Sequence, residues 1–211
     1  MTIRVLLADD HGMFRAGLRA LLHASPDIQV AGEAATGLEA LEILRETPVD
    51  VVCMDVLMPD MNGIEAARQL LQRRPDIRIL ILSMQSSMQH VHFAFAAGVL
   101  GYLLKEAPGE ELVTAVRTVF RGERYICSRL REMIRDGDDL AGASPLDSLS
   151  PRERQVLQLV AEGKTSAEIA GIVHLSPKSI DTYRSRLMKK LQIDDIASLV
   201  KFAISHGVTP G

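Results

Sequence analysis

The chain has 211 residues, of which 47% are hydrophobic and 24% charged, with a formal net charge of −3. This length accommodates one large or two small domains, and the apolar content is enough for a sizeable core. No apolar run reaches about 18 residues, the start lacks a signal-peptide pattern and the two cysteines have no metal-ligand spacing, so we expect a reduced, cytoplasmic protein without a membrane span.

The charge is unevenly distributed along the chain. Residues 146–211 carry nine basic and seven acidic side chains, a net +2, whereas residues 1–145 carry 15 basic and 20 acidic side chains, a net −5. An acidic first part followed by a mildly basic second part predicts two regions with different functions.

The first part alternates short apolar runs with amphipathic stretches. The strands are expected at Ile3–Ala8, Ile28–Ala31, Val51–Met54, Ile79–Leu82 and Gly101–Leu104. The helices are expected near 12–24, 37–46, 63–73, 88–97 and 109–121. This alternation predicts an α/β doubly wound fold with a five-stranded parallel sheet, covered by helices on both faces.

Five polar residues follow the predicted strands: Asp9, Asp10, Asp55, Ser83 and Lys105. Right-handed crossovers bring the carboxyl ends of parallel strands to one edge, where ligands bind in such folds. Any one of these residues alone is explained as a cap of a strand or helix. Together, three carboxylates would repel one another without a cation, and Mg²⁺ prefers oxygen ligands. The set therefore predicts a metal-assisted phosphoryl site, with a carboxylate as acceptor.

These residues lie in motifs that resemble the CheY-like receiver domain of two-component response regulators. The motifs are ADDH (8–11), MDVLMPDMNG (54–63), LSM (82–84) and GYLLK (101–105), and the resemblance spans residues 1–122. It implies that Asp55 is phosphorylated and that Mg²⁺ is held by Asp10, Asp55, the Leu57 carbonyl and, through water, Asp9. It also implies that Lys105 pairs with the phosphoryl group, that Ser83 is the switch hydroxyl, and that Tyr102 turns inward when Ser83 moves.

Two further features bear on signalling. Leu57 and Gln85 stand two places after Asp55 and Ser83, where members of this family control the access of hydrolytic water, so an apolar Leu57 predicts slow self-dephosphorylation. The segment 84–95 contains no Asp, Glu, Lys or Arg. Phe93 and Leu100 could face solvent there as a partner-binding patch, although ordinary core packing is the simpler interpretation.

Residues 123–145 are expected to form a linker. Within it, Ser128–Arg135 could form a helix of two turns, and the composition that follows is typical of a flexible tether. The domain boundary is therefore expected near 137–146.

The pattern of residues 146–211 is helical throughout and predicts an all-α four-helix domain. Ser150-Pro151-Arg152-Glu153 has the form of a capping box with proline in the first turn. Helices are expected from there to Ala161, from Thr165 or Ser166 to Val173, from Pro177 to Leu191, and over Ile196–Ile204.

The third of these helices has two distinct faces. Ile180, Leu187 and Leu191 lie along one stripe, which is its expected core face. The outer face is basic and rich in hydroxyls, and it carries Lys178, Thr182, Ser185, Arg186 and Lys189. The charges alone fit a solvated amphipathic helix, but the short helix and tight turn before it favour a helix-turn-helix at about 166–185 that enters a DNA major groove.

Residues 149–193 closely resemble a LuxR-type DNA-binding domain, and the similarity continues to about 207. With the receiver, this implies a NarL/FixJ-type response regulator rather than an enzyme. A sensor histidine kinase would phosphorylate Asp55, and phosphorylation would control homodimerisation and sequence-specific DNA binding. The role of Asp181, an acid at the edge of the recognition surface, is left open. So is whether the unphosphorylated receiver covers the recognition helix or simply fails to dimerise.

Two rival functions are weaker. A phosphatase using Asp55 as an intermediate would need a second acid two residues later, and position 57 is Leu. A phosphorylation-independent regulator would not need the complete set of five site residues.

Overall fold

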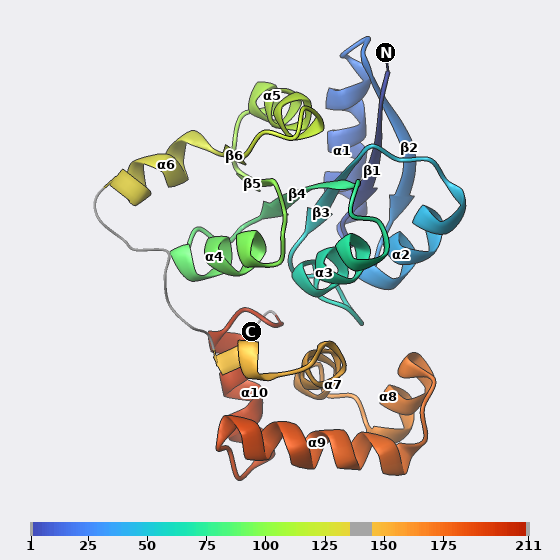
Figure 1. The fold of residues 1–211 in the computed structure, drawn as a ribbon, viewed down its shortest axis with the longest axis vertical. Helices are drawn as coiled ribbons and strands as arrows, with labels where there is room; N and C mark the ends of the chain where they lie inside the picture. The colour runs from blue at the N-terminus through green and yellow to red at the C-terminus, as the bar shows by residue number, and fades with distance from the viewer. Residues whose placement is uncertain (1, 136–144, 210–211) are drawn as a thin grey trace.

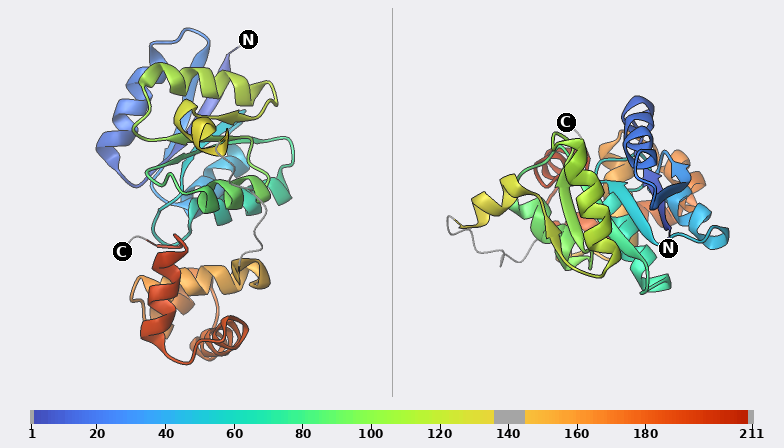
Figure 2. Two further views of the ribbon diagram at one scale, coloured as in Figure 1. Left: turned by 90° about the vertical axis from the view of Figure 1, so that its left-hand side faces the viewer. Right: turned by 90° about the horizontal axis from the view of Figure 1, so that it is seen from above.

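The structure, a computed structural model, describes residues 2–135 and 145–209 (Figure 1). The first part of the chain forms an α/β layer structure, and the second forms a separate group of helices beneath it (Figures 1 and 2). In the described residues no helix is long and apolar enough to cross a membrane.

The sheet is parallel throughout, with strand order β2-β1-β3-β4-β5-β6. Its strands are β1 (Ile3–Ala8), β2 (Ile28–Ala34), β3 (Val51–Asp55), β4 (Arg78–Ser83), β5 (Gly101–Leu104) and β6 (Tyr125–Ile126). The expected fold class is confirmed, but the number of strands was wrong, because the described residues form a sheet of six. β6 escaped prediction because two residues show no periodicity; it pairs with Gly101 and Tyr102 at the edge of the sheet.

Helices cover both faces of the sheet. They are α1 (Gly12–His23), α2 (Gly37–Glu46), α3 (Gly63–Arg73), α4 (Met88–Ala96) and α5 (Gly109–Phe120). In Figure 1, α1 and α5 lie above the sheet, and α2, α3 and α4 lie below it, on the side of the second domain. The inner strands β1, β3, β4 and β5 are buried almost completely, as expected for strands that are covered on both faces. The edge strand β2 is mostly half-buried.

The segment after α5 packs against the sheet before the chain leaves it. Tyr125, Cys127 and Leu130 belong to the same buried cluster as the strands. The predicted two-turn helix is present as α6 (Ser128–Arg135). Both cysteines are buried and free, and Cys53 is a core residue of β3. The domain boundary predicted near 137–146 falls mainly outside the described residues.

The second domain consists of a short 3-10 turn, η1 (Pro145–Ser148), and four helices. These are α7 (Pro151–Ala161), α8 (Ser166–Val173), α9 (Pro177–Leu191) and α10 (Ile196–Ser205). The predicted capping box of α7 is formed by Ser150 and Glu153, and α8 has a second one formed by Thr165 and Glu168. The predicted core residues Ile180 and Leu187 of α9 are fully buried, and Leu191 is partly buried.

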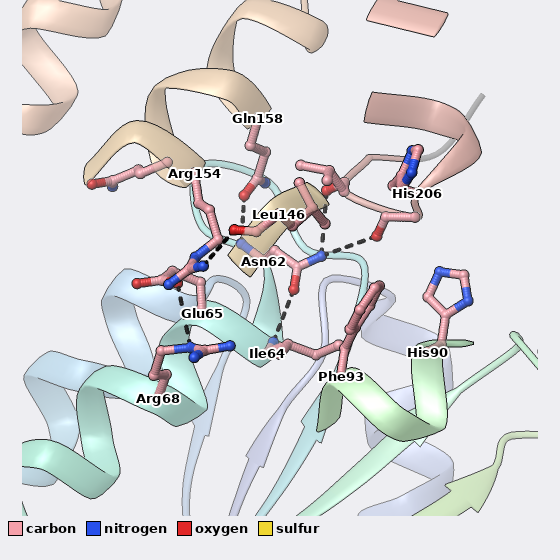
Figure 3. Close-up of a pocket in the computed structure, with 13 residues that line it drawn as sticks. Asn62, Ile64, Glu65, Arg68, His90, Phe93, Leu146, Arg154, Gln158 and His206 are labelled. Carbon is pink, nitrogen blue, oxygen red and sulfur yellow. Dashed lines mark hydrogen bonds and ion pairs between the residues drawn. The ribbon is translucent and has the colours of Figure 1, made fainter. Parts of the chain in front are cut away.

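The two domains contact each other through α3, α4, α7 and the end of α10 (Figure 3). Phe93 of α4, considered above as part of a solvent-facing patch, is 8% exposed because it packs into the core of the helical domain. Leu100 packs instead against the core of the sheet. A partly buried ion pair between Glu65 and Arg154, with 3.0 Å between Arg154 Nε and Glu65 Oε2, crosses the same interface. The interface contains a partly open cavity of about 50 Å³.

Candidate phosphoryl site and candidate DNA surface

The predicted polar cluster lies at one edge of the sheet. Asp9, Asp55, Ser83 and Lys105 stand at the carboxyl ends of β1, β3, β4 and β5, which are consecutive neighbours in the sheet. Asp9, Asp55 and Ser83 are no more than 3% exposed, whereas Asp10 beside them is open to solvent. The parallel topology therefore assembles residues that are far apart in the sequence.

Lys105 provides the positive charge at the centre of this cluster. Its ammonium nitrogen lies 2.7 Å from Asp55 Oδ2 and 2.7 Å from Asp9 Oδ2. The same nitrogen lies 4.8 Å from the centre of the Phe14 ring, whose face favours a cation. The positive charge of one lysine thus balances part of the negative charge of two buried carboxylates.

The electrostatic state of Asp55 reflects opposing influences. Burial raises the pKa of its carboxyl group, and the hydrogen bond from Lys105 opposes that rise. The neighbouring charge of Asp9 raises it further, while a backbone hydrogen bond from Leu57 lowers it. A carboxylate with little water around it and a cation beside it has the character of a nucleophile rather than of a surface acid.

The cluster also has the donor set that a hard divalent cation requires. Atoms of Asp9, Asp10, His11 and Asp55 that could hold a metal all lie within 4.8 Å of one another. Asp9 Oδ2 is buried and, among the described residues, receives no well-directed hydrogen bond although Lys105 is near. Carboxylate oxygens of this kind fit Mg²⁺. Sequence reasoning missed His11, whose Nδ1 lies 2.8 Å from Asp10, although its place directly after the acidic pair could have suggested it.

The predicted switch residues are linked through the backbone of one residue, Gln85. Its N–H donates to the Ser83 hydroxyl at 2.9 Å, and its carbonyl accepts from the Tyr102 hydroxyl at 2.8 Å. Tyr102 is completely buried, and this burial raises the pKa of its phenol well above the ordinary value. The side chain therefore already points inward, and a shift of Ser83 would be felt at Tyr102 through Gln85.

The outer face of α9 is open to solvent. Lys178, Thr182, Ser185, Arg186 and Lys189 are all exposed, so in this structure the receiver does not cover the predicted recognition surface. Figure 1 shows α9 on the side of the helical domain that faces away from the sheet. Two of its hydroxyls, those of Thr182 and Ser185, donate to backbone carbonyls one turn earlier.

Asp181, whose role the sequence left open, has a local structural contact. Its carboxylate accepts a hydrogen bond from the Ser166 hydroxyl at 2.8 Å, and Arg184 donates to the same hydroxyl at 3.2 Å. These bonds join the start of α8 to α9 and fix the angle between the two helices of the motif.

Sequence reasoning did not identify the polar residues of the domain interface. Gln158 of α7 and Asn62, the N-cap of α3, are 2% and 9% exposed and hydrogen-bond to each other across it (Figure 3). The only signal in the sequence is that Gln158 interrupts an apolar run, Val156–Val160.

Comparisons with known proteins agree with both halves of this description. The family model of the response regulator receiver domain matches residues 5–117, and that of the bacterial regulatory proteins of the luxR family matches residues 147–203. The response regulator UvrY of Escherichia coli K12 is 38% identical over 208 residues, covering 98% of this chain and 95% of UvrY. The response regulator GacA of Pseudomonas aeruginosa is 37% identical, covering 98% and 97%.

A solved structure also resembles this chain over nearly its whole length. RcsB from Salmonella enterica serovar Typhimurium, bound to a promoter in the presence of the phosphomimetic BeF3−, aligns with a TM-score of 0.64 and 27% identity. The alignment covers 97% of this chain and 100% of that one.

Proposed function

Because the chain belongs to the two-component response regulators that join a receiver to a LuxR-type DNA-binding domain, we propose that Asp55 is its phosphoacceptor. The protein regulates transcription, and the phosphoryl donor would be a sensor histidine kinase. The observation that carries this proposal is the position of Lys105, 2.7 Å from both Asp55 and Asp9 at the sheet edge. Its ammonium can pair with a phosphoryl group on Asp55 as well as with the free carboxylate.

The functions of the protein are divided between domains whose boundaries are those expected from the sequence. We assign residues 1–122 to the receiver, 123–145 to the linker and 146–211 to the DNA-binding domain, with the helix-turn-helix at about 166–185. As a regulator rather than a classical enzyme, the protein would act in the cytoplasm, where kinase and DNA are both accessible.

The cation of the site would be Mg²⁺. Asp10, Asp55 and the Leu57 carbonyl would hold it directly, and Asp9 would hold it through water. The bound ion would neutralise charge on the donor phosphoryl group as it approaches the carboxylates. An Asp55 oxygen would form the new bond to phosphorus as the bond between phosphorus and the donor breaks, and the electron pair of that bond would leave with the donor. Lys105 would keep its charge beside the transferred group.

The output would begin at the residues that meet the new phosphoryl oxygens. Phosphorylation adds about −1.5 to −2 charges and three acceptor oxygens. Ser83 would move to donate to one of them, and Tyr102 would follow through its link to Gln85. An apolar Leu57 beside the phosphoryl group would slow its hydrolysis, which a Leu57→Asn variant should accelerate in a measurement of the decay of the phosphorylated form.

The DNA contacts would come from the exposed face of α9. Lys178 and Lys189 would hold phosphates, while Thr182, Ser185 and Arg186 would approach base edges in the major groove. The RcsB structure bound to a promoter supports this use of the second domain. A homodimer would place two such helices on half-sites about one helical turn apart.

The proposal is tested by incubating the full chain with Mg²⁺ and a small phosphodonor. Wild type should gain the mass of one phosphoryl group and bind promoter DNA more tightly. Asp55→Ala should do neither, because it lacks the accepting oxygen. A phosphorylated Asp55→Ala protein would show that another residue is the acceptor.

A further inference from the structure

The loop between β3 and α3 follows Asp55 directly and is fastened to it. The Gly63 N–H donates to the Val56 carbonyl at 2.8 Å, which closes the base of the loop. A side chain at Gly63 has no room, because a Cβ there would lie 1.8 Å from the Asp55 carbonyl oxygen. Hydrogen bonding from the Leu57 backbone also lowers the pKa of the Asp55 carboxyl group. The loop therefore packs directly against the backbone of Asp55.

A single side chain of the DNA-binding domain spans the loop. Gln158 Nε2 donates to the Met58 carbonyl at 2.8 Å, and the Asn62 N–H donates to Gln158 Oε1 at 2.6 Å (Figure 3 shows the second bond). Both bonds are buried. The amide of Gln158 thus pairs with the backbone on the two sides of the loop, in the way that a neighbouring strand would.

Other residues of the DNA-binding domain also contact this loop. Lys164, in the turn after α7, places its ammonium 3.4 Å from the Asp60 carboxylate. The Asn62 side-chain amide donates to the carbonyls of Gly207 and Val208 at 3.3 Å each, after the end of α10. The DNA-binding domain therefore touches every second residue of the loop from Met58 to Asn62.

We propose that the docked DNA-binding domain opposes cation binding at the Asp55 site, because Gln158 holds the loop that follows Asp55. The inference rests on the proposed function, in which the Leu57 carbonyl is a ligand of Mg²⁺. That carbonyl belongs to the peptide that joins Leu57 to Met58. Gln158 fixes the carbonyl of the next peptide, so any turn of the first peptide that cation binding requires would strain or break buried hydrogen bonds.

The coupling works in both directions. If docking weakens Mg²⁺ binding by some factor, Mg²⁺ binding weakens docking by the same factor. This gives the receiver a direct route to the second domain through the loop, separate from the route through Ser83 and Tyr102. It also explains why a glutamine is buried within the apolar run of α7.

The experiment measures the Mg²⁺ dissociation constant of the full chain from chemical shifts in an NMR titration. Gln158→Leu removes both loop bonds at similar volume, and Gln155→Leu is the matched control. Gln155 lies on the same helix, is 4% exposed and borders the same interface cavity, but its side-chain oxygen accepts its hydrogen bond from Arg152. We expect Gln158→Leu to bind Mg²⁺ at least about fivefold more tightly than wild type, the lower end of typical coupling factors, and Gln155→Leu to match wild type.

A second variant tests the inference in case Gln158→Leu impairs folding. Lys164→Met alters a partly exposed contact with Asp60, and it should tighten Mg²⁺ binding in the same direction by a smaller factor. The difference between wild type and Gln158→Leu should persist in a Ser83→Ala background, because the loop route does not pass through Ser83.

Three results would overturn the inference: equal Mg²⁺ affinities in Gln158→Leu and Gln155→Leu, weaker binding in Gln158→Leu, or loss of the difference in the Ser83→Ala background. Failure of wild type to be phosphorylated would instead overturn the proposed function, since the Mg²⁺ titration does not depend on phosphoryl transfer.

Discussion

The acidic pocket and the recognition face use charged residues in opposite ways. In the pocket, Asp9 and Asp55 are almost inaccessible to water and share one lysine, Lys105. On the recognition face, Lys178 and Lys189 are exposed and stand on a single helix. Burial makes the charges of the pocket interdependent, because each is compensated only by its neighbours. Water and salt screen the charges of the face, so each acts nearly alone until DNA is bound.

This difference predicts the largest loss of stability at Lys105. Lys105→Met leaves two buried carboxylates without their cation, and breaking a buried pair in this way costs about 3–5 kcal/mol. The free energy of unfolding, measured by urea denaturation at neutral pH, should fall by that order. Mg²⁺ should recover part of the loss, because it binds the folded pocket and supplies the missing positive charge.

The control for this prediction is Lys201→Met, at an exposed lysine of α10. A surface substitution of this kind should change the free energy of unfolding by no more than about 0.5 kcal/mol. Equal changes in the free energy of unfolding for the two substitutions would show that Lys105 does not stabilise the pocket. They would also contradict the proposed difference between buried and exposed charges.

The sequence alone predicts some of these regions and not others. The difference depends on whether a region is set by local patterns or by contacts between residues far apart in the sequence. The pocket was predictable because each residue ends an apolar run, and parallel topology forces the ends of those runs together. The recognition face was predictable because helical periodicity within Pro177–Leu191 places its residues on one side. The interface was not, because Gln158 bonds to positions 96 and 100 residues away, and no local pattern indicates which domain surface will face another.

A second prediction concerns the recognition face, where the effect should appear in binding rather than in stability. Lys178→Ala should weaken DNA binding about equally for all sequences and should lower the salt slope by about 1, because one phosphate contact is lost. The measurement is DNA affinity at several salt concentrations.

Lys201→Ala is the matched control, since Lys201 is also an exposed lysine but lies on α10, away from the predicted groove-facing surface. It should leave the salt slope unchanged. An unchanged slope in Lys178→Ala would remove Lys178 from the set of phosphate contacts, and a large loss of folding stability would contradict the independence of charges on this face.

The smallest predicted effect concerns the interface between the two domains, at His90 of α4. Its ring is 7% exposed and packs on Gly207, where an added Cβ would lie 1.6 Å from its Nε2 atom. Its Nδ1 bonds to the Ser87 hydroxyl, and among the described residues its Nε2 has no hydrogen-bond partner. The other charged or titratable groups around the cavity include His206 and the ion pair of Glu65 with Arg154.

Burial lowers the pKa of His90 below its ordinary value of 6.5, and His206 lowers it further. The docked form therefore binds fewer protons than the open form, so docking should be fully stable above about pH 6.5 and weaken as the pH falls below it. Small-angle scattering between about pH 7.5 and 5.5 should show the domains separating toward the acidic end. His90→Phe, which fills similar space without titrating, should reduce this dependence, whereas His23→Phe at an exposed site of α1 should retain it. Full pH dependence in His90→Phe would show that the acid-sensitive group lies elsewhere in the interface.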